Sequence, residues 1–373
     1  MKILVIEPYL TDSHQRWIDG FRDEVTWEVQ TLTLPARHWK WRMHAAAITL
    51  SGLLDSLNYT PDVLIVSEMM DVALFKALIC KAGHGHLPIL LYFHENQLCY
   101  PISASDEDHK KHFDNHYAFI NYTSALTADQ LIFNSTFHQD VFLNALPKFL
   151  KGFPKPNTIE CQPQLAPKST VIYPGMSFRL MKPHQRYNNP HPIILWNHRW
   201  EYDKNPRLFF DTLTNLNDLN IDFRLVVIGK SFGKIPKAFS EAREEFSDKI
   251  LQWGQVKSIN DYYTWLARSD IVVSTSLQDF FGISVVEAMY HRCWPILPNR
   301  LAFPEHIPKE FQSECLYDHD ADLLPLLRKA IDLHPRYCSA MDNIMAHIKR
   351  YDVSAVNAQY KRLFAKIFST KGS

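Results

Sequence analysis

The chain has 373 residues, which is more than a single hydrophobic core usually organises, so we expect two domains. Its 40 basic and 40 acidic residues balance, so the chain has no net charge that would attract it as a whole to nucleic acid or to a membrane. Any RNA binding would need a local patch of basic residues. No run of about 18 apolar residues could span a membrane and no secretory signal begins the chain, so we expect a cytoplasmic protein.

The first half of the chain alternates strand-like and helix-like patterns, which predicts a parallel sheet with crossover helices. Short apolar and β-branched runs predict strands at 3–7, 27–32, 62–67, 89–93, 130–134 and 169–173. Amphipathic spacing predicts helices near 38–57, 71–82 and 109–127. Residues 147–192 hold nine of the 22 prolines, and this shift in composition marks a domain boundary.

A second alternating set predicts strands at 193–196, 224–228, 250–253, 271–274 and 294–297, with helices at 206–219, 260–267 and 283–291. The tail at 337–368 is helical in pattern, with an interruption near 351–353. The expected fold is α/β, with two Rossmann-like doubly wound domains, 1–185 and 186–350, facing across a cleft. The last segment, 351–373, would form a helix that crosses back to the first domain. Ligands bind beyond the carboxyl ends of strands in such sheets, so we expect the site in the cleft.

Two carboxylates flank a glycine at a strand-to-helix junction in the second domain. Asp279 precedes Gly282 and Glu287 follows it, within STSLQDFFGISVVEAM. Unpaired amides at a helix start can bind a phosphate or a sugar hydroxyl, and both carboxylates could bind hydroxyls of the same ligand. Alternatively, Asp279 is an N-cap and Glu287 interacts favourably with the helix dipole. The spacing is compatible with both interpretations.

Two cations follow the first strand of the second domain. Arg199 and Lys204, in WNHRWEYDKNP, could converge on an anionic ligand, and a guanidinium fork with an ammonium suits a diphosphate. Alone, such a pair would more simply be solvated loop cations. The glycine loop on a later strand of the same sheet favours the anionic ligand.

Polar residues also end two strands of the first domain, where they could face the cleft. His94 and Glu95 could serve acid–base chemistry or bind hydroxyls, or they could simply cap a loop. The sequence Ser13, His14 and Gln15 forms a polar helix start. This loop lacks the glycines of a dinucleotide-binding fingerprint, so NAD is not expected.

No metal site is expected. His109, His112 and His116 have the spacing of one helical face, but no fixed acidic or cysteine partner accompanies them, and 18 histidines make chance clustering easy. The six cysteines contain no Cys-x-x-Cys pair, which argues against structural zinc and a disulfide framework. Nothing in the residues specifies an oligomeric state.

The second domain resembles the retaining glycosyltransferases of the two-domain B-type fold, in particular family 4. The resemblance lies in HRWEYDKNP, in VVIG at 226–229 and in DFFGISVVEAM. It implies that Arg199 and Lys204 bind the donor diphosphate, that Glu287 binds the ribose hydroxyls, and that Asp279, where the family has Glu, contacts the transferred sugar. It further implies donor contacts at Gly229, Phe281, Gly282, Ile283 and Ser284.

The first domain narrows this resemblance to the tRNA-queuosine α-mannosyltransferase family. It is carried by PYLTDSHQRWIDGF, FHENQLCYP and FNSTFHQDVFL, and by the Phe280-Phe281-Gly282 form of the donor loop; Thr11-Asp12 stand where the family has small residues. The resemblance implies transfer of mannose from GDP-mannose to queuosine in the tRNA anticodon loop, with retention and without a metal or other cofactor. His94 would then contact a sugar hydroxyl, and Glu95 the acceptor.

Two alternatives remain beside this hexosyltransferase. One is a family-4 enzyme that uses another nucleotide-sugar, or a lipid or polysaccharide acceptor. The sequence has no basic amphipathic helix near the N-terminus, and this absence counts against a membrane-bound lipid acceptor. The other is a non-catalytic protein that binds a nucleotide-sugar or RNA. The aromatic and basic residues at 39–42 are a segment to test for RNA contact.

Overall fold

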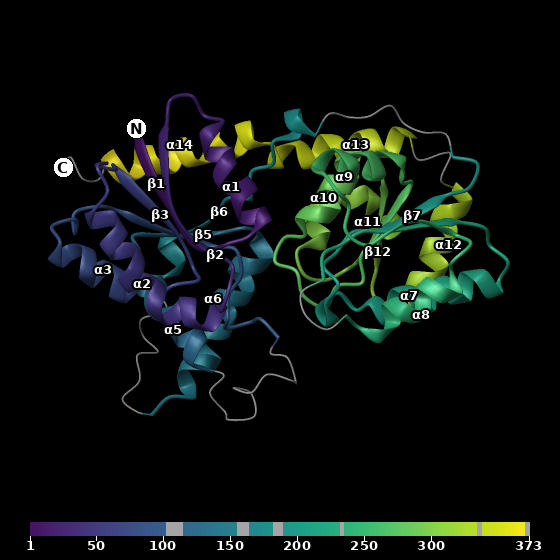
Figure 1. Ribbon diagram of the computed structural model, residues 1–373, viewed down its shortest axis with the longest axis horizontal. Helices are drawn as coiled ribbons and strands as arrows, with labels where there is room; N and C mark the ends of the chain where they lie inside the picture. Colours follow the sequence, from purple (N-terminus) through teal and green to yellow (C-terminus); the bar gives the residue numbers. More distant parts are fainter. Residues whose placement is uncertain (102–114, 155–163, 182–188, 232–234, 334–337, 370–373) are drawn as a thin grey trace. The chain divides into compact units, whose positions relative to one another are not determined.

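The computed structural model describes residues 1–101, 115–154, 164–181, 189–231, 235–333 and 338–369. The chain divides into two compact units, one formed by Met1–Ser177 with Tyr351–Ser373 and the other by Phe178–Arg350. Each unit contains a six-stranded sheet with helices packed against it (Figure 1). The predicted boundary at 185/186 lies outside the described residues, and the units divide between Ser177 and Phe178.

The first sheet is parallel throughout and has the strand order β2-β1-β3-β4-β5-β6. All six of its strands were predicted from the sequence. Their bounds are β1 (Lys2–Leu10), β2 (Glu28–Pro35), β3 (Val63–Ser67), β4 (Ile89–Phe93), β5 (Gln130–Phe133) and β6 (Ser169–Val171). The helices of this unit are α1 (Asp12–Arg22), α2 (Trp39–Asp55), α3 (Val72–Lys81), α5 (Asn115–Thr127), α6 (Thr136–Lys151) and α14 (Val353–Ser369).

Alternate side chains of β1 enter two separate cores, because successive strand residues point to opposite faces of a sheet. Leu4 and Ile6 are fully buried in a cluster that includes side chains of α2, α3, α5 and α6. Ile3 and Val5 lie in a second cluster with side chains of α1 and α14. The continuous apolar runs of these strands therefore reflect burial on both faces.

The last helix of the chain belongs to the first unit. Val356, Tyr360, Phe364 and Ile367 lie on one face of α14 and are buried against α1 and the sheet. The Asn357 side chain, also buried, donates a hydrogen bond to the Gly20 carbonyl at 2.9 Å. The predicted return of the C-terminal helix to the first domain is confirmed.

The second sheet is also parallel and has the order β12-β11-β10-β7-β8-β9. Its strands are β7 (Ile193–Trp196), β8 (Arg224–Val227), β9 (Ile250–Trp253), β10 (Ile271–Val273), β11 (Trp294–Pro298) and β12 (Leu316–Tyr317). Its helices are α7 (Pro206–Asp218), α8 (Lys237–Glu245), α9 (Ile259–Arg268), α10 (Ile283–Tyr290), α11 (Gln312–Cys315), α12 (Leu323–Leu333) and α13 (Cys338–Ile348).

Several elements were absent from the sequence prediction: α6, α8, α11, α12 and β12. Helix α6 contains Pro147, a residue type that usually interrupts a helix. The start of α6 is capped by the Ser135 side chain, which accepts a hydrogen bond from the His138 amide at 3.0 Å. Strand β12 has only two residues, and its pairing with β11 is a tertiary contact that no local pattern reveals.

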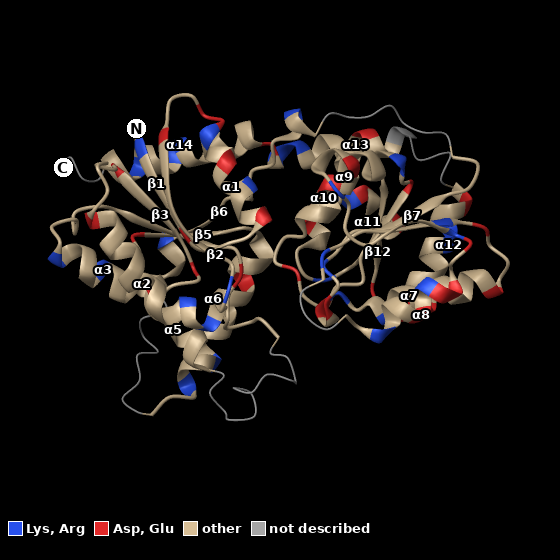
Figure 2. Cartoon of the chain, in the orientation of Figure 1, with Lys and Arg blue, Asp and Glu red and all other residues tan. Residues whose placement is uncertain are grey.

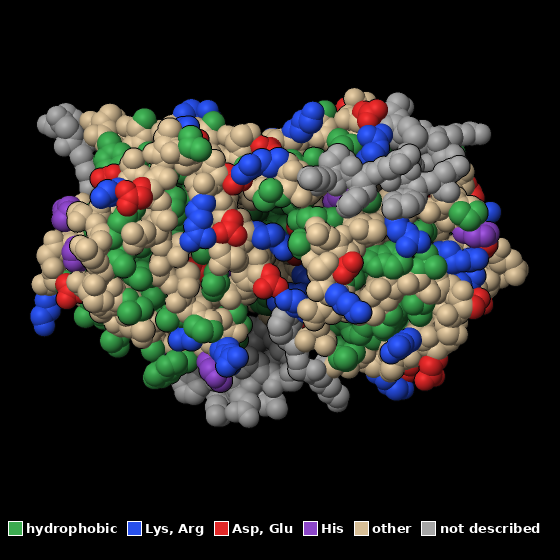
Figure 3. Space-filling model, turned by 45° about the horizontal axis from the view of Figure 1, so that its top comes forward, with side chains coloured by type: hydrophobic (Ala, Val, Ile, Leu, Met, Phe, Trp, Pro, Cys, Tyr) green, Lys and Arg blue, Asp and Glu red, His purple; other side chains and the backbone are tan. Residues whose placement is uncertain are grey.

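On the face of the molecule that Figure 3 draws, Lys and Arg side chains of the described residues are interspersed with Asp and Glu on both units, as the balanced composition predicts. Among the described residues, no helix is both long and apolar enough to cross a membrane.

Replacing Phe364 with Ala tests the contribution of α14 to the first unit. The side chain is 3% exposed, so its removal should lower the free energy of unfolding by about 3–5 kcal/mol. Phe368→Ala is the matched control, because Phe368 lies on the same helix and is 38% exposed. Thermal denaturation should show a much larger fall in melting temperature for Phe364→Ala; equal effects would contradict the described packing.

Candidate functional site

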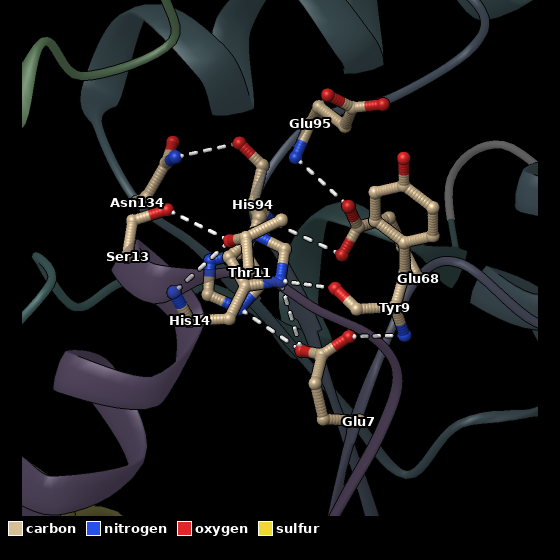
Figure 4. A network of polar contacts seen from close by, with 9 residues as sticks. All are labelled: Glu7, Tyr9, Thr11, Ser13, His14, Glu68, His94, Glu95 and Asn134. Atoms are coloured by element: carbon tan, nitrogen blue, oxygen red, sulfur yellow. Dashed lines mark hydrogen bonds and ion pairs between the residues drawn. The ribbon is translucent and has the colours of Figure 1, made fainter. Parts of the chain in front are cut away.

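Polar side chains gather in each unit where strands end, and we describe the two groups separately. In the first unit Glu68, His94 and Asn134 directly follow β3, β4 and β5, while Glu7 lies in the second half of β1 and His14 in the first turn of α1 (Figure 4). Parallel pairing brings the carboxyl ends of neighbouring strands together, so these residues meet.

Glu7 lies against two imidazole rings in this group. It is fully buried, and its Oε2 lies 3.3 Å from His14 Nδ1 and 3.6 Å from His94 Nε2. Its Oε1 accepts a hydrogen bond from the Tyr9 amide at 2.8 Å. The two rings are stacked, with centroids 3.9 Å apart, and Trp17 packs against His94 in a T-shaped arrangement. Glu7 therefore fixes both rings from one side.

The group holds one charged and one neutral imidazole. Burial lowers the pKa of His14, but the attraction of Glu7 outweighs it and raises the pKa to about 9. Burial, together with the neighbouring His14 charge, lowers the pKa of His94 to about 4. Burial also opposes ionisation of Glu7, yet the two imidazoles hold its pKa far below the ordinary value. At neutral pH the group therefore contains a Glu7–His14 ion pair beside neutral His94.

Glu68 shapes the loop that carries His94. Its two carboxylate oxygens accept hydrogen bonds from the amides of His94 and Glu95, each at 3.0 Å. Burial, and then the charges of Glu95 and Glu7, raise the pKa of Glu68 to about 8. The Asn134 side chain donates to the His94 carbonyl at 2.8 Å, so the loop is held from both sides.

A metal ion can be bound by three or more His, Cys, Asp or Glu side chains whose ligand atoms lie close together. Within the described ranges, one group meets this condition, and it consists of Glu7, His14 and His94. Their arrangement does not suit a metal ion. The stacked rings are inclined by only 13° with centroids 3.9 Å apart, so their nitrogen lone pairs lie in two separate, nearly parallel planes and do not converge on one centre. His14 Nδ1 also lies 3.0 Å from the Tyr9 carbonyl. Of the three histidines considered from the sequence, His109 and His112 lie outside the described residues.

The predicted residues at the start of α1 separate into two sets. His14 enters the buried group, and the Ser13 hydroxyl lies 2.9 Å from that of Thr11, which caps the helix at the His14 amide. The side chain of Gln15 instead donates to Asp19 at 2.9 Å along the helix. The structure thus brings His14, Ser13 and His94 together, while Gln15 points elsewhere.

In the second unit, Lys204 follows β7 and is almost completely buried. Its Nζ lies 2.6 Å from the Gln278 carbonyl oxygen and 3.1 Å from a carboxylate oxygen of both Asp279 and Asp203. Burial lowers the pKa of Lys204, but the two carboxylates outweigh it and raise the pKa. Burial opposes ionisation of Asp279 as well, and Lys204 keeps its pKa below the ordinary value. The predicted cation and the first predicted carboxylate are therefore in direct contact.

Arg199 lies in the same loop but is more exposed. Half of its side chain is accessible, and its guanidinium is 3.3 Å from a carboxylate oxygen of Glu201. Its charge acts on Lys204, since it lowers the pKa of that ammonium. The loop after β7 thus presents an accessible guanidinium near a buried ammonium.

Two glycines allow close approach around this loop. Gly282 has φ +85°, which favours glycine, and it directly precedes α10, so the amides of Ile283 and Ser284 lie in the first turn. A Cβ on Gly229 would lie 1.9 Å from the His198 carbonyl oxygen. The chain after β8 therefore packs directly on the chain before Arg199.

Residues that the sequence analysis did not single out contact the segment 279–287. Glu287 is buried, and its Oε2 accepts a hydrogen bond from the Tyr262 hydroxyl at 2.8 Å. Asn197 donates to Tyr262 at 3.1 Å and to the Ser284 carbonyl at 2.8 Å. His306 is buried, and its Nε2 lies 2.6 Å from the Phe281 carbonyl oxygen. Burial lowers the pKa of His306 to about 4.

The acids Glu7 and Glu68 were also missed by the sequence analysis. Each carried a signal, because a carboxylate near the end of an apolar parallel strand is expensive to bury without a purpose. The residues that contact the segment 279–287 carried no such signal, since Tyr262 is an ordinary residue of a helix and Asn197 an ordinary residue of a loop.

Comparisons with known proteins agree with both halves of the chain. A family model described as the N-terminal part of tRNA-queuosine alpha-mannosyltransferase matches residues 2–176, and one for glycosyl transferases group 1 matches 178–333. A Drosophila melanogaster protein named tRNA-queuosine alpha-mannosyltransferase is 31% identical over 318 residues, which cover 83% of this chain and 82% of that protein. The chain belongs to the tRNA-queuosine α-mannosyltransferase family. The resemblance seen in the sequence is thereby confirmed.

Solved structures with the fold of this family member are more distant in sequence. Sucrose-phosphate synthase from Thermosynechococcus elongatus matches with TM-score 0.74 and 12% identity, over 99% of this chain and 100% of that one. Anabaena HepE in complex with UDP matches with TM-score 0.70 and 14% identity, over 98% and 100%. At these identities the likeness shows the fold alone, and it confirms the two-domain B-type glycosyltransferase class.

Replacing Glu7 with Gln should remove a pH-dependent part of the stability. The pKa of His14 is raised above its ordinary 6.5 to about 9, so its stabilisation is complete below about pH 6.5 and is lost as the pH rises through 9. The difference in melting temperature between wild type and Glu7→Gln should therefore shrink from pH 6.5 to 9. Asp55→Asn, at the exposed pair of Asp55 with His84, is the control and should show a small difference without this trend.

Replacing Gly229 with Ala should distort the loop that carries Arg199. The new Cβ would overlap the His198 carbonyl and lie 2.7 Å from the Trp200 side chain, so a loss of about 2 kcal/mol or more is expected. Gly52→Ala is the control: nothing lies within 4 Å of its Cβ in α2, and alanine there should stabilise slightly. Wild-type thermal stability of Gly229→Ala would refute the close packing.

Proposed function

We propose that this protein transfers mannose from GDP-mannose, with retention at the anomeric carbon, to queuosine in the anticodon loop of tRNA. The observation that carries the proposal is the combination of family membership with the contact between Lys204 and Asp279 beside the start of α10. The proposed setting is the cytoplasm, where tRNA is the acceptor.

In this proposal the second unit binds the donor. Arg199, Lys204 and the amides at the start of α10 stabilise the negative charge that develops on the departing diphosphate, without a metal. Glu287, oriented by Tyr262, binds the ribose hydroxyls. Asp279 is one methylene shorter than the glutamate of the family pattern, and its pairing with Lys204 supports a role beside the transferred sugar.

The first unit supplies the acceptor side. Neutral His94, stacked on charged His14, is suited to a hydrogen bond with a sugar hydroxyl instead of to strong base catalysis. The leaving phosphate then takes the proton of the acceptor hydroxyl as the new glycosidic bond forms. Glu95, whose amide is held by Glu68, contacts the acceptor.

The direct test incubates the purified protein with GDP-mannose, or separately with UDP-sugars, and queuosine-containing tRNA, followed by mass spectrometry of the nucleosides. We expect a hexose on queuosine with GDP-mannose only, and no product with tRNA that carries unmodified guanosine. Transfer from a UDP-sugar would overturn the donor assignment. Product on lipid or polysaccharide but not on tRNA would overturn the acceptor, and donor binding with neither transfer nor hydrolysis would indicate a non-catalytic protein.

Replacing Arg199 with Gln tests the diphosphate role with little risk to the fold, because half of this side chain is exposed. We expect kcat/KM to fall by about 100-fold or more, as when one stabilising donor is removed. Arg207→Gln on α7, another exposed and ion-paired arginine of the same unit, should retain activity.

Lys204→Ala should nearly abolish transfer, but it leaves Asp203 and Asp279 buried without their cation. Its activity must therefore be read together with its melting temperature. Near-normal kcat/KM in a folded Arg199→Gln variant would refute the assignment of the loop after β7 to the diphosphate.

A further inference from the structure

The beginning of α2 carries an unusual concentration of cations. Arg37, Lys40 and Arg42 lie within six residues, and no Asp or Glu occurs between residues 29 and 54. Lys40 and Arg42 belong to the first turn of the helix, whose dipole is positive there, so their charges oppose the helix locally. These basic residues are drawn in blue in Figure 2. Such a local cost indicates a use outside the helix itself.

Aromatic rings are interleaved with these cations. Trp39 and Tyr117 of α5 pack with ring centroids 5.0 Å apart, and the Lys40 Nζ lies 5.6 Å and 6.0 Å from the two centroids. Trp41 is 65% exposed, which is exceptional for so large an apolar side chain. We call this surface the α2 patch and define it as Arg37, Trp39, Lys40, Trp41, Arg42 and Tyr117.

The α2 patch adjoins the histidine group of the same unit, by which we mean Glu7, His14 and His94. Tyr9, Trp39 and Tyr117 all pack on one small apolar cluster formed by Met43 and two neighbours. The backbone of Tyr9 also contacts the histidine group, because its amide donates to Glu7 and its carbonyl lies 3.0 Å from His14 Nδ1. A polymer that places one residue at His94 would thus have its neighbouring residues within reach of the α2 patch.

We propose that the α2 patch binds unpaired nucleotides of an RNA loop, with Trp41 stacking on a base and Arg37 and Lys40 contacting phosphates. Exposed aromatic rings among cations are how proteins hold single-stranded nucleic acid, because every base has a face for stacking and every linkage carries a charge. The inference deepens the proposed function and rests on it, since it names the surface that holds the nucleotides beside the modified one.

The arrangement of charges favours RNA over an anionic membrane. The cations gather at one end of α2, whereas a membrane-binding helix carries them along its polar face beside a continuous apolar face. On the remainder of α2, Ile48 is the other strongly exposed apolar side chain, with Leu53 less so. A membrane role would depend on Ile48 as much as on Trp41, while stacking on a base requires a ring.

The test measures binding of the full-length protein to a synthetic anticodon stem-loop that carries queuosine, over a range of salt concentrations. Trp41→Ala should weaken binding by about ten- to hundredfold. The double variant Arg37→Gln/Lys40→Gln should lower the slope of log Kd against log salt by about one to two. Ile48→Ala, on the same helix, and Lys81→Gln, at the end of neighbouring α3, are the matched controls and should bind like wild type.

Four readouts separate the possible outcomes: GDP affinity, RNA binding, mannose transfer and vesicle binding. GDP affinity should be unchanged in every variant, which shows that the second unit is intact. Wild-type RNA binding by both α2 variants would overturn the inference even if the wild-type protein transfers mannose. Weakened RNA binding in the variants, with no transfer by the wild type, would support the inference and refute the proposed activity. Equal loss of binding to phosphatidylserine vesicles by Trp41→Ala and Ile48→Ala, without an effect on RNA, would assign the patch to a membrane.

Discussion

Parallel pairing of the strands is the constraint on which both groups of polar residues depend. In a parallel sheet the carboxyl ends of all strands lie at one edge, so loops that are far apart in sequence meet there. Strands β1, β3, β4 and β5 are consecutive neighbours in the first sheet, and the loops after three of them, with Glu7 from β1, build the histidine group. Strands β7 and β10 are neighbours in the second, which brings Lys204 to Asp279.

Both groups solve the problem of placing charge where water is scarce. An isolated buried charge costs several kcal/mol, whereas a paired and hydrogen-bonded one is tolerated. Glu7 is matched by His14, and Lys204 by Asp203 and Asp279. Such pairing keeps charged and polar groups in fixed positions before a ligand arrives, which is the condition for electrostatic stabilisation of a developing charge.

Sequence reasoning worked where the information is local. The apolar strand at 89–93 and the motif that holds Asp279, Gly282 and Glu287 are contiguous, so pattern and spacing were sufficient to place them. It failed where structure is set at a distance: two-residue β12 exists only through its register with β11, and the approach of Tyr262 to Glu287 depends on how α9 packs beside α10. The histidine group lies between these cases. His14 and His94 were recognised as candidate site residues from the sequence, but Glu7, which contacts both of them, was read only as part of a strand.

The return of α14 to the first unit has a consequence for the order in which the chain folds. The segment that completes one face of the first core is synthesised after every residue of the second unit. Domains generally fold as they emerge, so the second unit has all its residues available before the first can close its core. Until then Trp17, Phe21 and their neighbours on that face remain uncovered. The amino-terminal unit is therefore expected to complete its folding last, and a nascent chain that stalls before α14 would expose an apolar surface of the kind that chaperones recognise.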